Sequence, residues 1–436
     1  MTTFSLSAKS AAPSKSKANS YILPLILIVS LFFMWGMGSS INDILIKQFK
    51  KTFELTDFES GLVQSAFYLG YFLFAIPASL VMKKFNYKTG IVTGLFLFAA
   101  GAFLFYPAAQ LESYAFFLFA LFIIASGLTF LETAGNPYVA ALGDPATATF
   151  RLNLAQAFNP IGCVTGILIG QHFILTGVEH SKEELASMSH AAVQAYYTAE
   201  AHTVQMPYLI IGLTIVVAAL VIFLTKFPVV RDEETQSSVS TRQTLKFILS
   251  KRHYRMAVIA QFFYIGAQVC IWSYLIRYIQ ETIPGTSEKD AANFLTISLV
   301  VFTAGRFIGT ALLKRIKGHN LLWLYAALNV TLIAVALAFP GTIGLWALVA
   351  TSFFMSIMYP TIFSLGIRGL GEHTKLASSV LVMAIIGGAL LTPVMGLVSV
   401  YFGIGNAIVI PLICFAFIAY YGMVGYKEKT EEEVLA

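Results

Sequence analysis

Apolar stretches long enough to cross a lipid bilayer recur along nearly the whole of this 436-residue chain. Roughly 20 consecutive apolar residues form one membrane helix. Membrane strands would instead appear as segments of about ten residues with alternating polarity, and the sequence contains no such pattern. Only 11% of the residues are charged, whereas about 25% is usual for a soluble domain. The chain is therefore predicted to be an all-α membrane protein.

The apolar stretches predict twelve membrane spans, which a polar stretch divides into two groups of six. The spans lie near 21–47, 58–82, 89–109, 113–141, 149–173, 205–226, 254–280, 291–313, 320–339, 343–367, 376–402 and 405–425. We expect a disordered tail, a first six-helix bundle, a polar linker, a second six-helix bundle and a final tail, over residues 1–20, 21–226, 227–251, 252–426 and 427–436. Short helices are also expected in the polar stretch 175–203.

The distribution of basic residues predicts the orientation in the membrane. If the first residues are cytoplasmic, most of the 28 Lys and Arg side chains fall in cytoplasmic segments, with the linker carrying many of them. Such an excess is the positive-inside rule, so both termini are expected in the cytoplasm. Membrane topology thus accounts for the net charge of +6, and we expect no nucleic-acid partner.

The chain lacks the residue patterns of a metal site or of an enzyme. Cys163, Cys270 and Cys414 all fall within spans, without metal-ligand spacing, and such cysteines usually serve as small buried apolar residues. The sequence has no His-Glu-x-x-His motif and no Gly-rich phosphate loop. A membrane-embedded enzyme is therefore disfavoured, and no metal or cofactor is expected.

A short motif repeats at corresponding positions of the two halves. Pro137 and Pro360 each stand five residues before a Leu-Gly pair, near the ends of the fourth and tenth spans. Six plus six spans with a parallel repeat is the architecture of major facilitator transporters, which bind substrate near mid-membrane between the halves. The repeat, the number of spans and the linker together predict this fold.

Three glycines lie on one face of the fifth span, at Gly162, Gly166 and Gly170. Rows of small residues at this spacing allow helix backbones to approach closely in lipid. We expect this face to pack tightly against another helix and to allow sliding during gating.

Two carboxylates, Asp43 and Glu132, lie inside apolar stretches. A charge at the middle of a membrane helix costs roughly 2.5–3.5 kcal/mol, so such residues normally face a cavity or a partner. A carboxylate can also lose its charge by binding a proton, which suggests proton-coupled transport. Two alternatives remain: Asp43 reaches the outer interface from a helix end, or Glu132 forms a buried ion pair with Arg306 or Arg151.

Amide and aromatic side chains recur at helical spacing in several spans. Asn153, Gln156 and Asn159 begin the fifth span, and Gln261, Gln268 and Trp272 share one face of the seventh. Membrane amides often hold helices together, which is the alternative to a binding role. Amides also donate to and accept from sugar hydroxyls, while Trp272 and Tyr359 could cover an apolar sugar face. Few basic residues lie within the spans, which disfavours anionic substrates; Arg306 is expected to act in gating or packing.

Several segments resemble the L-fucose/proton symporters of the major facilitator superfamily, from about residue 20 to the end of the chain. They are Ile41–Leu45, Gln64–Tyr71, Leu131–Pro137, Phe150–Gln156, Gly266–Arg277 and Tyr359–Gly366. The resemblance implies a bacterial inner-membrane symporter that imports L-fucose or a related hexose together with a proton. Its two protonatable acids match Asp43 and Glu132. Its substrate-binding residues match Asn42, Asp43, Gln156, Asn159, Gln268, Trp272 and Tyr359.

The sequence departs from the wider superfamily between the second and third spans. The usual Asp-Arg-x-Gly-Arg-Arg loop is replaced by Met82–Lys88, which keeps basic residues and lacks the Asp. The standard loop gate therefore cannot be transferred. The same branch also includes glucose, galactose and mannose carriers, so a carrier of these hexoses, a hexose uniporter or a non-transporting sugar sensor remain alternatives. We expect a monomer in the lipid bilayer.

Overall fold

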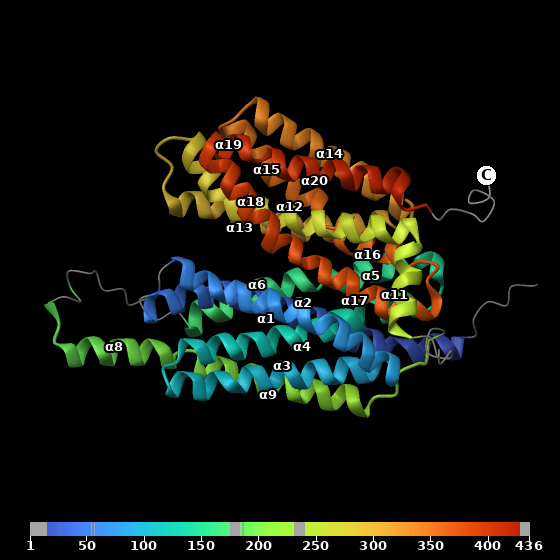
Figure 1. Cartoon of the computed structure of the whole chain (residues 1–436), viewed down its shortest axis with the longest axis horizontal. Coiled ribbons are helices and arrows are strands. Elements are labelled where there is room, and N and C mark those ends of the chain that lie inside the picture. Colours follow the sequence, from blue (N-terminus) through green and yellow to red (C-terminus); the bar gives the residue numbers. More distant parts are fainter. Residues whose placement is uncertain are drawn as a thin grey trace, which may run out of the picture.

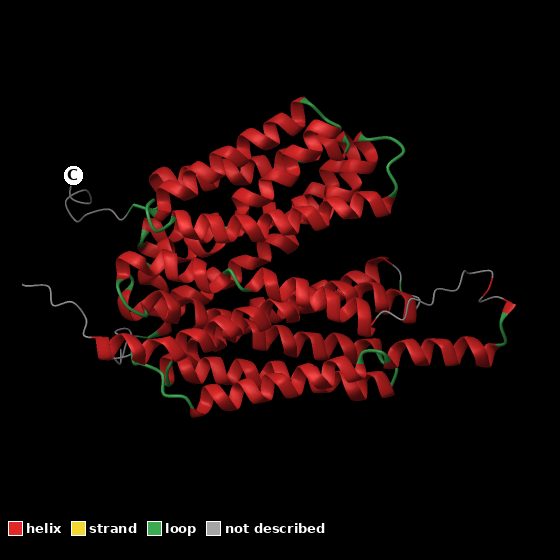
Figure 2. Cartoon of the chain, turned by 180° about the vertical axis from the view of Figure 1, so that it is seen from behind, coloured by secondary structure: helices red, strands yellow, loops and turns green. Residues whose placement is uncertain are grey.

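The computed structural model of the chain describes residues 15–53, 55, 57–174, 184, 187–230 and 240–427. Within these ranges the secondary structure is helical, with no strand; Figure 2 shows the helices from behind. Twelve helical segments are long and apolar enough to cross a membrane. Their ends lie within a few residues of most of the expected spans, so the prediction of a twelve-span, all-α membrane fold is confirmed.

The first bundle contains six spans, of which the fifth is interrupted. Its elements are α1 (Lys15–Thr52), α2 (Asp57–Lys84), α3 (Tyr87–Gln110), α4 (Tyr114–Ala141), η1 (Pro145–Thr147), α5 (Ala148–Gln156), α6 (Asn159–Ile169), η2 (Gly170–Ile174), α8 (His190–His202) and α9 (Gln205–Leu224). The interruption between α5 and α6 is followed by Pro160 in the first turn of α6, where proline is well tolerated because the first N–H groups of a helix have no intrahelical acceptor.

The second bundle repeats this organisation, and its tenth span is interrupted at the middle. Its elements are α12 (Arg252–Thr282), α13 (Glu288–Leu312), α14 (Gly318–Ala338), α15 (Thr342–Met355), α16 (Met358–Gly366), η3 (Gly371–His373), α17 (Thr374–Met383), η4 (Ala384–Ile386), α18 (Gly387–Phe402), α19 (Ile404–Ala407), α20 (Val409–Tyr420) and η5 (Tyr421–Gly425). The interrupted spans carry α5 and α16, which meet at the interface between the bundles.

The linker contains a helix that the sequence analysis did not predict, α11 (Thr241–Ser250). The Ser240 hydroxyl accepts from the backbone N–H of Gln243, and the Gln243 side chain accepts from the backbone N–H of Ser240. This reciprocal arrangement is a capping box, which is readable from sequence.

The predicted boundaries of the bundles, linker and tails stay predictions, and residues 1–14 and 428–436 lie outside the described ranges.

The two bundles contact each other near one end of the molecule. We call this the linker end, because the linker helix α11 packs there against α17 (Figure 1). Contacts between the bundles join α17 to α2 and α4, and join α5 to α13 and α16. Towards the opposite end, where α8 extends, the bundles spread apart (Figures 1 and 2).

Glycines of the fifth span pack closely against α1. A Cβ atom at Gly162 would overlap the carbonyl oxygen of Phe33, and one at Gly166 would lie 2.5 Å from the carbonyl oxygen of Met37. Gly170 is buried where α6 gives way to the π-helical turn η2. Close backbone contact is what the sequence predicted for Gly162 and Gly166; any sliding on this face stays a prediction.

Candidate functional site

Glu132 lies in α4 at the interface between the bundles and is 2% exposed. Its Oε1 atom accepts a hydrogen bond from the hydroxyl of Tyr359, which α16 of the second bundle supplies. Its Oε2 atom is buried and has no hydrogen-bond partner among the described residues. A carboxyl group of the first bundle is therefore held by a hydroxyl group of the second.

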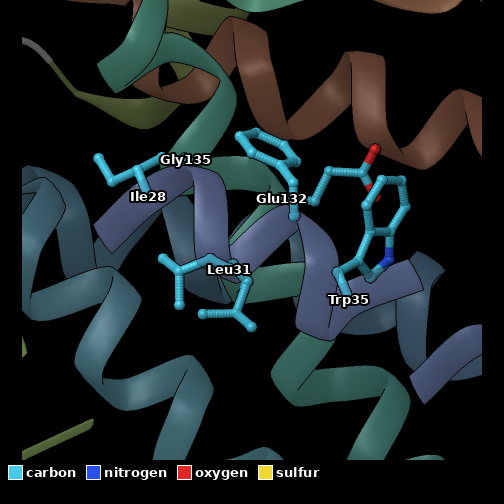
Figure 3. A pocket seen from close by; sticks show the side chains of 7 residues that line it. Ile28, Leu31, Trp35, Glu132 and Gly135 are labelled. Carbon is cyan, nitrogen blue, oxygen red and sulfur yellow. The ribbon is translucent and has the colours of Figure 1, made fainter. Parts of the chain in front are cut away.

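Two aromatic residues of the first bundle complete the surroundings of Glu132. Tyr71 of α2 interacts electrostatically with the carboxyl group, and the indole N–H of Trp35 donates to the Tyr71 hydroxyl oxygen at 2.5 Å. In Figure 3 the Glu132 side chain points towards the ring of Trp35. The carboxyl group thus lies among polar groups that carry no formal charge.

A small cavity opens beside Glu132 between α1 and α4 (Figure 3). Its lining is Ile28, Leu31, Phe32, Trp35, Leu131, Glu132 and Gly135. An apolar wall with a few polar groups is typical of a small-molecule site. Glu132 is the acidic residue of this lining.

A chain of amides connects the Glu132 region to Arg306 in α13. Asn136 lies one turn beyond Glu132, and its Oδ1 atom accepts from Gln156 Nε2 at 2.8 Å. The Arg306 guanidinium donates to the Gln156 backbone oxygen at 3.2 Å and to its Oε1 atom at 3.4 Å. Arg306 is 4% exposed and stacks over the Phe302 ring at 4.8 Å. The side chain of Gln156 is thus held by one hydrogen-bond partner from each bundle.

Neither arginine considered as an ion-pair partner of Glu132 contacts its carboxyl group in the structure. Arg151 donates to the carbonyl oxygens of Ala140 and Asp144, each at 2.7 Å, and so satisfies backbone groups at the end of α4. Arg306 donates to Gln156 instead. The ion-pair alternative is therefore not supported.

The other predicted binding residues that the structure describes lie on α6 and α12 and make contacts of their own. Trp272 packs edge-on against Phe302, with ring centroids 5.1 Å apart, and donates to Ser352 Oγ at 3.2 Å. Asn159 donates to the Phe32 carbonyl oxygen at 3.3 Å and so joins α6 to α1. Gln268 is half-buried. Trp272 and Gln268 belong to the predicted face of α12, whereas the described bond of Asn159 is a helix–helix contact.

Two predicted residues cannot be placed. Asn42 and Asp43 fall on α1, but their side chains lie outside what the structure describes. The expectation that Asp43 binds sugar and exchanges a proton, and its alternative at the outer interface, both stay predictions.

Two polar contacts join α5 of the first bundle to α16 of the second. Asn153 Nδ2 donates to Thr361 Oγ1 at 3.1 Å, and the hydroxyl oxygens of Thr149 and Ser364 are 2.8 Å apart. We call these four residues the linker-end gate. Each contact joins one bundle to the other, so separating the bundles at this end breaks both.

Sequence reasoning did not group Trp35, Tyr71 and Thr361 with the site. Tyr71 ends one of the segments that carry the family resemblance, and Trp35 lies in the apolar run of the first span. Both residues belong to other spans than Glu132, so no helical spacing in the sequence relates them to it. In the parts of the chain that the structure describes, no group of three or more His, Cys, Asp or Glu residues could hold a metal ion.

Comparison with known proteins identifies similar chains. Residues 26–393 match the profile of the Major Facilitator Superfamily. The chain is 49% identical to the L-fucose-proton symporter of Escherichia coli (strain K12) over 406 residues, which cover 92% of this chain and 93% of that one. It is 38% identical to a glucose/galactose transporter of Brucella abortus over 413 residues, 94% of this chain and 96% of the relative.

Solved structures agree with these similarities. A crystal structure of the Major Facilitator Superfamily transporter FucP in the outward conformation matches with a TM-score of 0.86 at 47% identity, covering 94% of this chain and 100% of that one. The proton:xylose symporter XylE matches with a TM-score of 0.68 at 14% identity, over 96% of this chain and 99% of that one. The second likeness concerns the fold alone.

Proposed function

The chain belongs to the Major Facilitator Superfamily, and from this premise we propose that it is a proton-coupled symporter that imports L-fucose by alternating access. It is a multi-pass membrane transporter and not an enzyme. The high identity to an L-fucose-proton symporter supports the choice of sugar. The observation that carries the mechanism is the hydrogen bond between Glu132 and Tyr359, because it joins a titratable group of one bundle to the other bundle.

Glu132 carries the coupled proton in this proposal. An ionised carboxylate costs free energy when it is buried without a charged partner, and the Oε2 atom of Glu132 is buried with no hydrogen-bond partner among the described residues. Protonation removes that cost and adds an O–H donor at the same position. The occluded, sugar-loaded state is therefore reached with Glu132 protonated. Release of the proton and the sugar to the cytoplasm then allows the empty carrier to return to the outward-facing state.

The amide chain positions the sugar-binding groups. Gln156 is fixed by Arg306 and Asn136, so its position depends on both bundles being close together. Gln268 and Trp272 lie on the facing helix α12 and supply further polar and aromatic contacts to the sugar. Asn42, Asp43 and Asn159 are assigned to the same site by family resemblance. A change of bundle position alters sugar contacts and the environment of Glu132 together, which is the coupling that symport requires.

The orientation follows from the basic residues. Lys83, Lys84, Lys314, Arg315 and Lys375 lie at or near the linker end, which the positive-inside rule places in the cytoplasm. The protein then lies in a bacterial inner membrane with both termini cytoplasmic, as a monomer. With the linker-end gate closed, the arrangement is the outward one. Its similarity to an outward-conformation symporter structure supports this assignment.

The driving force suffices for useful accumulation. One proton that moves down a potential of about 100 mV releases roughly 2.3 kcal/mol. Since each tenfold concentration ratio requires about 1.4 kcal/mol, one proton per sugar supports roughly fifty-fold accumulation. A uniporter would reach equal concentrations on both sides.

The test is uptake of radiolabelled L-fucose into proteoliposomes under an imposed inward proton gradient, with and without a protonophore. Accumulation that the protonophore abolishes supports the proposal. Uptake to equal concentrations in both conditions indicates a uniporter. Binding of L-fucose without any uptake indicates a sugar sensor.

A second substrate is favoured by a specific similarity, the 38% identity to a glucose/galactose transporter. The same vesicles should therefore be tested with galactose, glucose and mannose. Proton-driven accumulation of one of these sugars, with none of L-fucose, would keep the mechanism and replace the substrate.

A further inference from the structure

The hydroxyl group of Tyr264, in the middle of α12, is buried without a hydrogen bond. The side chain is 1% exposed, and its oxygen has no hydrogen-bond partner among the described residues. Tyr254 of the same helix, in contrast, donates to the carbonyl oxygen of Ala377 at 2.7 Å. A buried hydroxyl without a partner costs free energy, so the position of Tyr264 requires a physical reason.

Tyr264 lies on the face of α12 that carries two of the predicted sugar-binding residues. Gln268 and Trp272 follow it at intervals of four residues, so the three side chains lie along one side of the helix. Helix α12 begins at the linker end, next to α11 (Figure 1). In the proposed orientation, Tyr264 is therefore the nearest of the three to the cytoplasm. A sugar that leaves Gln268 and Trp272 for the cytoplasm passes Tyr264.

The Tyr264 hydroxyl interacts electrostatically with Arg306 and Tyr359. The two tyrosine rings have their centroids 6.2 Å apart, and the Nε atom of Arg306 also has no hydrogen-bond partner among the described residues. A cation attracts the oxygen of a nearby hydroxyl and repels its hydrogen. The hydrogen of Tyr264 is therefore directed away from Arg306, where it can donate to an oxygen atom of a ligand.

Separation of the bundles changes the surroundings of Tyr264. Its two neighbours both bond to the first bundle in the present arrangement, Arg306 to Gln156 and Tyr359 to Glu132. When the bundles separate at the linker end, these first-bundle residues move away from the region around Tyr264. A buried donor then becomes accessible to the sugar on its route to the cytoplasm.

We propose that the Tyr264 hydroxyl donates a hydrogen bond to a hydroxyl oxygen of the sugar once the linker end opens. Tyr264 is then a substrate-binding residue of the cytoplasmic half of the route, and this inference rests on the proposed transport function. The hydroxyl gains its partner only in the open, sugar-loaded arrangement. A ligand that binds one arrangement better than another shifts the equilibrium towards it, so the contact favours opening of the loaded carrier.

The test measures efflux of L-fucose from right-side-out membrane vesicles that are loaded with increasing sugar concentrations and treated with a protonophore. Tyr264→Phe removes only the hydroxyl group. We expect this variant to raise the half-saturating internal L-fucose concentration about 2- to 10-fold, the effect of losing one hydrogen bond.

The matched control is Tyr421→Phe. Tyr421 is also fully buried, its hydroxyl has no hydrogen-bond partner among the described residues, and it lies in η5, at the end of the last span. The control variant should leave the half-saturating concentration unchanged.

A series of L-fucose analogues, each with one hydroxyl replaced by hydrogen, separates a sugar contact from an effect on the protein alone. The difference between Tyr264→Phe and the unmodified protein should disappear for the analogue that lacks the bonded hydroxyl and persist for the others. The same factor for every analogue would show that Tyr264 acts on protein conformation or on bound water, and would overturn the proposal. An unchanged half-saturating concentration for L-fucose would overturn it as well.

Melting temperatures in detergent show that each variant is folded. Because Tyr264→Phe removes a buried hydroxyl that bonds to no described residue, its melting temperature should not fall. The protonophore removes the proton gradient, so the sugar contact can be confirmed or overturned whether or not transport is coupled to protons. If the vesicles carry galactose in place of L-fucose, the same series of analogues built on galactose applies the test.

Discussion

Tyr359 of the second bundle donates a hydrogen bond to Glu132 of the first. The tyrosine lies at the start of α16, immediately after the interruption of the tenth span, and the glutamate lies within α4. Both side chains are almost fully buried. This bond can persist only while the bundles are close at this depth, so the ionisable group is directly sensitive to bundle position.

Removing the hydroxyl from this pair should impair transport. Tyr359→Phe leaves both Glu132 oxygens without the donor from the second bundle, and a hydrogen bond to a charged group contributes about 1.5–3 kcal/mol. We expect initial rates of proton-driven L-fucose uptake to fall about tenfold or more. Tyr278→Phe is the control, since its hydroxyl donates to Ala336 within the second bundle at 3.2 Å. Equal losses in both variants would contradict a special role for Tyr359.

Arg306 should affect L-fucose binding by positioning Gln156, and not through its charge alone. Arg306→Lys keeps the charge and loses the planar group that reaches two Gln156 oxygens and stacks on Phe302. We expect L-fucose affinity, measured by isothermal titration calorimetry, to weaken about tenfold. Arg277→Lys, a change near the far end of α12 where the guanidinium lies 5.4 Å from the Tyr274 ring, should leave affinity unchanged. Unaltered binding by Arg306→Lys would exclude the positioning role.

The linker-end gate should hold the outward arrangement. Thr361→Val removes the acceptor of Asn153 Nδ2, and Ser364→Ala removes the partner of Thr149. With about 0.5–1.5 kcal/mol for each bond, the ratio of inward to outward forms should rise about 2- to 10-fold per substitution. The measurement is labelling of an introduced linker-end cysteine in inside-out vesicles. Thr331→Val, whose hydroxyl bonds within its own helix, serves as the control; labelling no faster than in that control would refute the gate.

The glycine face of the fifth span makes a prediction about stability. At Gly166 a Cβ atom would lie 2.5 Å from the Met37 carbonyl oxygen, so the helices must separate to admit alanine. Overpacking of this kind costs about 1–3 kcal/mol, and we expect Gly166→Ala to lower the melting temperature in detergent. Gly405→Ala, where the nearest atom is 3.8 Å away, should have little effect. Identical melting curves would show that α1 and α6 are loosely packed.

The sequence predicts those features of the protein that depend on a single helix. Span positions follow from hydropathy, and Glu132, Gln156 and Tyr359 stood out as polar or resemblance-bearing residues of apolar helices. The contacts among them were not predictable, because they depend on how helices distant in sequence pack. Trp35 and Tyr71 illustrate this: each looks like an ordinary aromatic residue of its span until α1, α2 and α4 are brought together. The helix α11 differs, since the Ser240 and Gln243 pair was a readable signal.

The most direct test of the account compares net accumulation with sugar exchange in the same proteoliposomes. Glu132→Gln keeps the shape of the side chain and cannot ionise, so we predict that it retains L-fucose counterflow and loses proton-driven accumulation. The matched control is Glu200→Gln, because Glu200 is equally buried, at 2% exposed, yet lies in α8 and accepts a hydrogen bond from Gln48 of α1. This variant should accumulate sugar normally. Full accumulation by Glu132→Gln would contradict the assignment of the coupled proton to Glu132.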